Sequence, residues 1–279
     1  MPEFIVKPAT LKALWKILPS LPAGRKYLAG GTDLVNALSS GKDGSACWVD
    51  ISAIGELRAI KETKKTVFIG AGATISEIEN SSAARRWAPA LAACIPHFAS
   101  PSLRNMATIG GNAANASPCA DGVCALISER AAVRLEVRGK KRKIPLSKLF
   151  LGPKTTALRK DEIILGFEIP KWRHAASYQK LGPRAYFGIS KAAAAVSAEI
   201  RSGAVAEAHI ALASVGPIPV YAAKTSAFLK GRRLDAEVIA KAAEIAKTEV
   251  SPITDVRSGA DYRRQMCGVL VARALRALR

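Results

Sequence analysis

Apolar positions in the first 170 residues recur at short intervals and predict brief helices and strands separated by turns. A helix is predicted at Leu11 to Leu18, and a short strand leads into the glycine pair Gly30-Gly31. Pro89 and Pro96 interrupt an alanine-rich helix expected at about residues 83–99, because proline lacks the amide hydrogen that a helix interior requires. The other elements predicted here are strands at residues 48–51, 66–69, 132–137 and 163–169 and a short helix from Ser76.

The last third of the chain predicts strands followed by helices. Strands are expected at residues 175–180, 191–200 and 205–214, with Gly203 and residues 216–219 as turns between them and after them. The run from Ala192 to Ala195 is ambiguous, since alanine favours a helix whereas its flanking residues fit a strand. Helices are expected at residues 222–229, 235–248 and 259–278, and the last of them has a mostly apolar stripe typical of a core-facing surface.

The chain has 279 residues, of which 49% are apolar, so it can bury one or two cores. The pattern changes at Pro170, and we expect three parts: residues 1–55, 56–170 and 171–279. No apolar run approaches the roughly twenty residues that span a bilayer. The first residues, Met-Pro-Glu-Phe, lack the charged and then apolar pattern of a secretory signal. A cytoplasmic protein without a membrane span is therefore expected.

The formal charge of +20 raises the question of nucleic-acid binding. The positive excess is spread over both halves, and its densest run, Arg138 to Lys143, lies between two strand-like segments, as in an exposed hairpin turn. The chain shows no helix-turn-helix signal and no ladder of aromatic residues. We expect no nucleic-acid partner, and a basic surface could instead steer an acidic partner subunit or an anionic acceptor.

Cysteine and histidine residues are scattered. The five cysteines predict no disulfide framework, and only Cys119 and Cys124 lie close together, without a second pair to complete a metal site. The three histidines stand apart, and no hydrolase triad or pair of catalytic carboxylates is evident. We therefore expect neither a metal site nor catalytic side chains, which suits a protein whose chemistry belongs to a bound cofactor.

Two loops with glycine pairs, about eighty residues apart, carry the candidate chemistry. Leu28 to Val35 contains Gly30 and Gly31, and Thr108 to Asp121 contains Gly110 and Gly111. Glycine lets the backbone approach a ligand closely, and successive N–H groups can then face one anion. Neither loop has the spacing of the dinucleotide fingerprint or of the lysine-bearing phosphate loop, so two simple tight turns remain the alternative.

The order of motifs resembles the FAD-binding medium subunit of the molybdenum hydroxylases, the group that contains carbon monoxide dehydrogenase, xanthine dehydrogenase and 4-hydroxybenzoyl-CoA reductase. The resemblance runs nearly end to end. It is carried by residues 8–18, 28–35, 70–76, 100–121, 161–170, 177–180 and 251–264, the last with Asp255, Arg257, Ser258, Tyr262 and Arg263 in the family's order. It implies an α+β protein: a two-part FAD-binding fold of the PCMH, or vanillyl-alcohol oxidase-like, type, followed by an α+β domain with a three-stranded antiparallel sheet and a helical bundle.

The resemblance also implies the site. The two glycine loops would hold the FAD pyrophosphate, Asp121 would bond to cofactor hydroxyls, and Phe98 would lie beside the FAD. Ile164 and Leu165 would contact the flavin, and Lys180, with a register uncertain by one residue against Gln179, would reach its edge. The complete set is Leu28, Ala29, Gly30, Gly31, Thr32, Asp33, Leu34, Phe98, Thr108, Ile109, Gly110, Gly111, Asn112, Ser117, Asp121, Ile164, Leu165 and Lys180.

The function implied by the resemblance is electron transfer. A large subunit with the molybdenum cofactor would oxidise the substrate, a small subunit with [2Fe–2S] clusters would relay electrons, and this chain would pass them through FAD to NAD or another acceptor. Some members of the family carry an extra iron–sulfur cluster in this subunit. The alternatives are a free-standing flavin-dependent oxidoreductase of the same fold and a basic binding protein without a cofactor.

Overall fold

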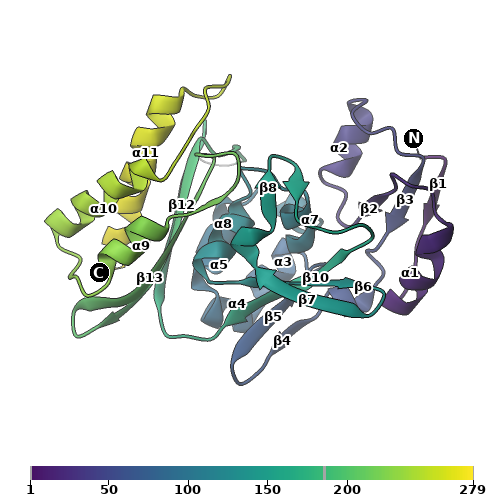
Figure 1. Ribbon diagram of the computed structural model, residues 1–279, viewed down its shortest axis with the longest axis horizontal. Coiled ribbons are helices and arrows are strands. Elements are labelled where there is room, and N and C mark those ends of the chain that lie inside the picture. The colour runs from purple at the N-terminus through teal and green to yellow at the C-terminus, as the bar shows by residue number, and fades with distance from the viewer. Residues whose placement is uncertain (1, 185–186, 279) are drawn as a thin grey trace.

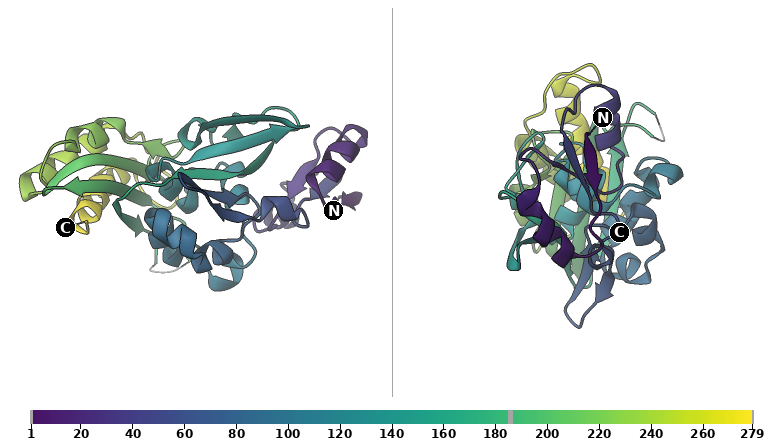
Figure 2. Two further views of the ribbon diagram at one scale, coloured as in Figure 1. Left: turned by 90° about the horizontal axis from the view of Figure 1, so that it is seen from below. Right: turned by 90° about the vertical axis from the view of Figure 1, so that its right-hand side faces the viewer.

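The computed structural model describes residues 2–184 and 187–278, and three parts follow one another along its longest axis (Figures 1 and 2). The first part is a parallel three-stranded sheet in the order β1-β3-β2, with Leu14 and Val49 in its core. Helix α1 begins after Thr10, whose side chain accepts a bond from the Ala13 N–H. The elements are β1 (Phe4–Val6), α1 (Leu11–Ile17), η1 (Leu18–Ser20), β2 (Lys26–Leu28), α2 (Leu34–Ser39) and β3 (Cys47–Asp50).

The second part has a five-stranded antiparallel sheet in the order β4-β5-β10-β6-β7, with helices packed against it. The predicted strands are confirmed as β5 (Thr66–Gly70), β6 (Ala132–Val137) and β10 (Ile163–Pro170). The remaining elements are η2 (Gly55–Leu57), β4 (Ile60–Glu62), α3 (Ile75–Asn80), α4 (Ser82–Trp87), α5 (Pro89–Cys94), η3 (Ile95–His97), α6 (Pro101–Arg104), α7 (Ile109–Ala114), α8 (Asp121–Ser128), β7 (Lys140–Pro145), η4 (Leu146–Lys148), β8 (Phe150–Gly152) and β9 (Thr155–Thr156).

Two predicted features of this part take a modified form. The alanine-rich segment at residues 83–99 is three short helices, α4, α5 and η3, because Pro89 is the first residue of α5 and Pro96 is the second residue of η3. The basic run forms a hairpin as expected, but only Arg138 and Gly139 occupy its turn, both with positive φ. Its other residues, Lys140 to Lys143, belong to β7, an edge strand of the sheet, where lysine and arginine side chains discourage pairing with another sheet.

The C-terminal part is an antiparallel sheet covered on one face by three helices (Figure 1). The predicted three-stranded sheet is present, and a two-residue strand, β14, extends it to four in the order β11-β12-β13-β14. The bounds are β11 (Ala175–Leu181), β12 (Ala192–Arg201), β13 (Ala204–Ala213), β14 (Val220–Tyr221), α9 (Ala223–Leu229), α10 (Ala236–Thr248) and α11 (Ala260–Arg276).

The ambiguous run from Ala192 to Ala195 is strand, and alternate residues of β12 enter two different cores. Ala192 and Ala194 pack toward the C-terminal helices, whereas Ala193 and Ala195 pack toward the core of the second part. Because both faces of the strand are covered, the periodicity expected of a half-buried strand is absent. Small side chains let layers on both sides approach the sheet closely.

Helix α8 joins the second part to the C-terminal sheet. All eight of its residues are buried, and it contacts β12 and β13. Carboxylates at its two ends bond to the β11 segment: Asp121 to Lys180, and Glu129, which follows the helix, to His174. This helix is therefore the structural link between the two units.

Candidate cofactor site

The first glycine loop turns the chain from β2 into α2. Gly31 has a φ of +73°, a conformation that favours glycine. A Cβ on Gly30 would overlap the carbonyl oxygen of Met106, so this loop lies against the segment that precedes the second glycine loop. The structure thus brings together two loops that are far apart in the sequence.

The backbone of the first loop leaves a row of donors unpaired. Across residues 2–184 and 187–278, no protein acceptor is bonded to the N–H groups of residues 29–34. Six consecutive peptide donors without protein partners are uncommon in a folded chain unless solvent or a ligand satisfies them. They suit an anion such as a pyrophosphate.

The second glycine loop is more self-contained. Thr108 caps α7 by accepting a bond from the Gly111 N–H at 3.0 Å. The N–H groups of Ile109 and Gly110 bond to the carbonyls of Ala73 and Ala71, at 3.1 and 2.8 Å. Gly110 packs so closely on Ala71 that a Cβ would clash. This loop therefore contributes shape and side chains, and the free N–H donors come mainly from the first loop.

A side-chain bond connects the two loops directly. Asn115, just after α7, donates from Nδ2 to Oδ1 of Asp33 at 2.9 Å. The Lys154 ammonium donates a bond to the amide oxygen of Asn115 at 2.5 Å. Neither Asn115 nor Lys154 belongs to the predicted set, since nothing in the local sequence indicates contacts between residues so distant in the chain.

Beyond α7, the predicted residues continue as one set of contacts. Asn112 accepts a bond from the Val123 N–H at 3.2 Å, which ties α7 to the start of α8. A Cβ on Gly122 would meet the side chains of Ile109, Asn112 and Phe98. Phe98, 9% exposed, thus lies beside the second loop, as the resemblance implied, although it is also part of the core.

A buried polar cluster follows at the first residue of α8. Asp121 accepts one bond from the Tyr178 hydroxyl and one from the Lys180 ammonium, both at 2.6 Å. Lys180 also donates to the carbonyl of His97 at 3.0 Å. Burial raises the pKa of Asp121, while Lys180 and Tyr178 oppose that shift by stabilising the carboxylate. The structure places Lys180, rather than Gln179, on Asp121, and it adds Tyr178, which sequence reasoning missed.

The last predicted residues are less directly connected. Ile164 is buried in the core of the second part, and Leu165, half-buried, packs toward the core of the first. The Leu165 carbonyl accepts a bond from Ala71, the residue on which Gly110 packs. Ser117 accepts a bond from the Cys119 N–H and so shapes the turn before α8.

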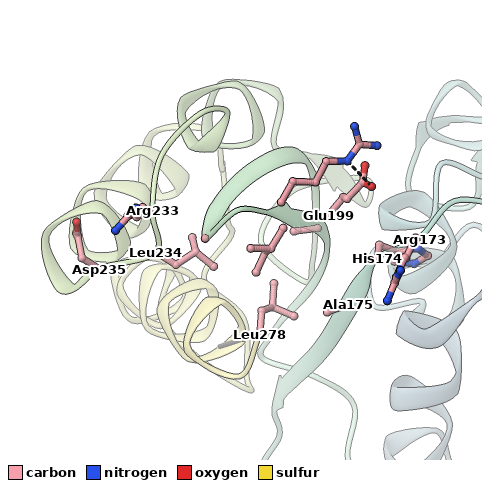
Figure 3. A pocket seen from close by; sticks show the side chains of 12 residues that line it. Arg173, His174, Ala175, Glu199, Arg233, Leu234, Asp235 and Leu278 are labelled. Atoms are coloured by element: carbon pink, nitrogen blue, oxygen red, sulfur yellow. Dashed lines mark hydrogen bonds and ion pairs between the residues drawn. The ribbon is translucent and has the colours of Figure 1, made fainter.

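A separate pocket of about 1120 Å³ opens on the C-terminal part (Figure 3). Arg173 and His174 lie on one side of it, Arg233 and Asp235 on the other, and Leu278 between them. It shares no residue with the predicted cofactor set, so volume alone does not locate the cofactor. In the part of the chain that the structure describes, no group of three metal-ligating side chains lies together, and no helix is long and apolar enough to cross a membrane.

Comparison with known proteins decides the family. Residues 2–172 match the model for the FAD binding domain in molybdopterin dehydrogenase, and residues 177–278 match the CO dehydrogenase flavoprotein C-terminal domain. The chain belongs to the FAD-binding medium subunits of the molybdenum hydroxylases. The medium chain of carbon monoxide dehydrogenase from Hydrogenophaga pseudoflava is 31% identical to this subunit over 94% of this chain and 91% of that one.

Other relatives agree with this assignment. The xanthine dehydrogenase FAD-binding subunit of Escherichia coli O157:H7 is 26% identical to this medium subunit over 96% of its length and 92% of the relative's. A solved structure of carbon monoxide dehydrogenase from Hydrogenophaga pseudoflava superposes with a TM-score of 0.96 at 30% identity, covering all of this chain and 97% of the other. The expected α+β fold, the flavoprotein oxidoreductase class and the cofactor FAD are thereby confirmed.

The residues of this medium subunit fit FAD. Unpaired N–H groups at residues 29–34 can bond to phosphate oxygens, and the glycines allow the approach. The Lys180–Asp121 pair supplies charged groups next to α7, where a polar or anionic part of the cofactor can be recognised. Which atoms of FAD each predicted residue contacts remains a prediction.

Proposed function

We propose that this medium subunit holds FAD across its two glycine loops and is the electron-exit subunit of a molybdenum hydroxylase. Electrons would come from the [2Fe–2S] clusters of a small partner subunit, and NAD or another acceptor would remove them. A large subunit with the molybdenum cofactor would oxidise the organic substrate. FAD supplies the redox chemistry when bound, because it can take up and release electrons.

The row of unpaired donors at residues 29–34 is the observation that supports this proposal most strongly. Its N–H groups would stabilise the pyrophosphate charge through hydrogen bonds, and the Asp33 carboxylate beside them already accepts a bond from Asn115. Asp121 and Lys180 would orient the rest of the cofactor through directed hydrogen bonds. None of these side chains has to react with the substrate, which agrees with a relay role.

The buried acid of the cofactor set is not placed as a general base. Within the described residues, the cofactor set contains one buried acid, Asp121, and it is bonded to a lysine and a tyrosine rather than poised as a free base. A positioned base in substrate oxidation would need access to the substrate proton. Substrate chemistry would therefore take place in the partner that holds molybdenum.

The test compares the isolated medium subunit with the complex from native extract. We expect the purified chain to show oxidised-flavin absorbance after incubation with FAD and to leave organic hydroxylase substrates unchanged. Co-purification with a molybdenum subunit and an iron–sulfur subunit should restore substrate-dependent bleaching of that absorbance. Substrate turnover by the lone chain would instead favour a free-standing flavoenzyme, and a chain that stays colourless would exclude both.

A further inference from the structure

Tyr178 bonds to a residue of the predicted cofactor set, Asp121, but is itself almost fully buried. The residue is only 4% exposed, and its ring belongs to the core of the second part although it comes from β11 of the C-terminal sheet. Its hydroxyl donates to Oδ1 of Asp121, while the Lys180 ammonium donates to Oδ2. The two oxygens of one carboxylate are therefore held by two residues of the same strand.

Lys180 keeps one donor free. Its side chain is 9% exposed, and its ammonium group bonds to Asp121 and to the His97 carbonyl. An ammonium group has three hydrogens. Within the described residues the third hydrogen has no protein acceptor, so it is available to a ligand.

The ionisation state of Asp121 decides whether the positive charge of Lys180 is compensated. When Asp121 is ionised, the pair is neutral, and a ligand meets a polarised but uncharged group. When Asp121 is protonated, Lys180 presents an uncompensated positive charge. Whatever keeps Asp121 ionised therefore controls the field that the cofactor experiences.

We infer that Tyr178 is a positioning residue of the cofactor site, whose hydroxyl keeps the Asp121 carboxylate charged and fixed so that Lys180 faces the cofactor as half of a neutral pair. This inference rests on the proposed FAD function. The phenol is suited to the role because burial and the nearby Asp121 charge raise its pKa well above the usual value, so it remains a donor. A water molecule could not replace it readily in so closed a position.

Other groups near Asp121 cannot take over this role as the structure stands. The thiols of Cys94 and Cys124 are fully buried, and burial raises the pKa of each, so they stay neutral. His97 is bonded to Lys180 through its backbone carbonyl and not through its ring. The titratable groups that face Asp121 are Lys180 and Tyr178 on β11, His97 on η3, Cys94 on α5 and Cys124 on α8.

The test measures the midpoint potential of bound FAD against pH in the FAD-loaded subunit, by spectroelectrochemistry. Tyr178→Phe removes only the hydroxyl and should raise the pKa of Asp121, because a donor to a charged group is lost; the expected shift is about one to two pH units. Below the new pKa the uncompensated Lys180 should favour reduced FAD roughly tenfold, which is about 30 mV for a two-electron couple. The potential of the variant should therefore exceed that of the wild type between the two Asp121 pKa values and coincide with it above and below that pH window.

Matched variants separate this role from general packing. Tyr221→Phe removes a hydroxyl that bonds to His209 on the C-terminal part, and its curve should coincide with the wild type. In an Asp121→Asn background, Tyr178→Phe should have no further effect on the potential. In a His97→Gln background the Tyr178→Phe effect should persist, because the His97 carbonyl is retained.

Each outcome is decisive. Coincident curves for Tyr178→Phe and the FAD-loaded wild type would overturn the inference while leaving the proposed function intact, and failure of the wild type to bind FAD would overturn the proposed function itself. If Tyr178→Phe does not fold, 3-fluorotyrosine at position 178 supplies a more acidic hydroxyl with little change in shape. It should move the inflection to lower pH, and an unchanged inflection would again contradict the inference.

Discussion

Asn115 donates a hydrogen bond to Asp33 at 2.9 Å across 82 residues of sequence, and this bond joins the two glycine loops. Asn115→Ala should weaken FAD binding about tenfold, the effect of roughly 1.4 kcal/mol, because the loops lose their side-chain connection. FAD titration followed by fluorescence measures the change. Asn80→Ala is the control, since the exposed Asn80 side chain donates at the same distance, 2.9 Å, but only to the Ser76 carbonyl within its own helix, α3. Equal affinities for wild type and Asn115→Ala would show that the bond does not organise the site.

Gly30 should tolerate no side chain. A Cβ there would overlap the Met106 carbonyl, so Gly30→Ala must separate the two loops and displace the unpaired N–H groups. We expect FAD affinity to fall at least tenfold with the far-ultraviolet spectrum preserved. Gly44→Ala is the matched control in the same part of the chain, because a Cβ at Gly44 meets no atom within 4 Å. Retention of FAD by Gly30→Ala would remove this loop from the proposed site.

The buried pair Glu129–His174 should make stability depend on pH. His174 Nε2 lies 2.7 Å from Glu129, and the side chains are 1% and 0% exposed. Burial by itself would lower the pKa of His174, but the bond and charge of Glu129 raise it above its ordinary value of 6.5. The folded protein then holds the proton more tightly than the unfolded chain. The contribution to stability is complete below about pH 6.5 and is lost as pH rises through the elevated pKa.

Thermal unfolding from pH 5 to 9 measures this effect. In His174→Gln the melting temperature should fall less steeply above pH 6.5 than in the wild type. The substitution should also lower the free energy of unfolding by about 3–5 kcal/mol, because it leaves Glu129 without its ionic partner. Burial is the main cause that lowers the pKa of His209, so a substitution of His209 should leave the fall in melting temperature above pH 6.5 unchanged. A wild-type melting temperature that rises between pH 6.5 and 9 would contradict the assignment.

Local sequence was informative where the cause of a structure is local. The glycine pairs, the breaks at Pro89 and Pro96 and the hairpin at Arg138 each depend on the backbone of a few residues. The strand at Ala192 to Ala195 could not be resolved in this way, because burial on both faces, which only the assembled layers provide, removes its periodicity.

The candidate site was predictable in outline and not in its connections. The resemblance indicated Asp121 and Lys180, but the bond from the Tyr178 hydroxyl to Asp121 becomes visible only when β11 packs against the helices of the second part. Likewise, the two loops look equivalent in sequence. Their N–H groups differ because Ala71 and Ala73 supply acceptors to the second loop alone, and that pairing is a property of the tertiary structure.

Asp121 at the start of helix α8 bonds to Lys180 of β11, and Glu129 just after its end bonds to His174, the residue before β11. These two buried ionic contacts join the second part of the chain to the C-terminal part, so a bending motion between the two parts would have to break both of them. A cofactor bound beside this helix would therefore meet side chains that are fixed to both parts of the chain at once.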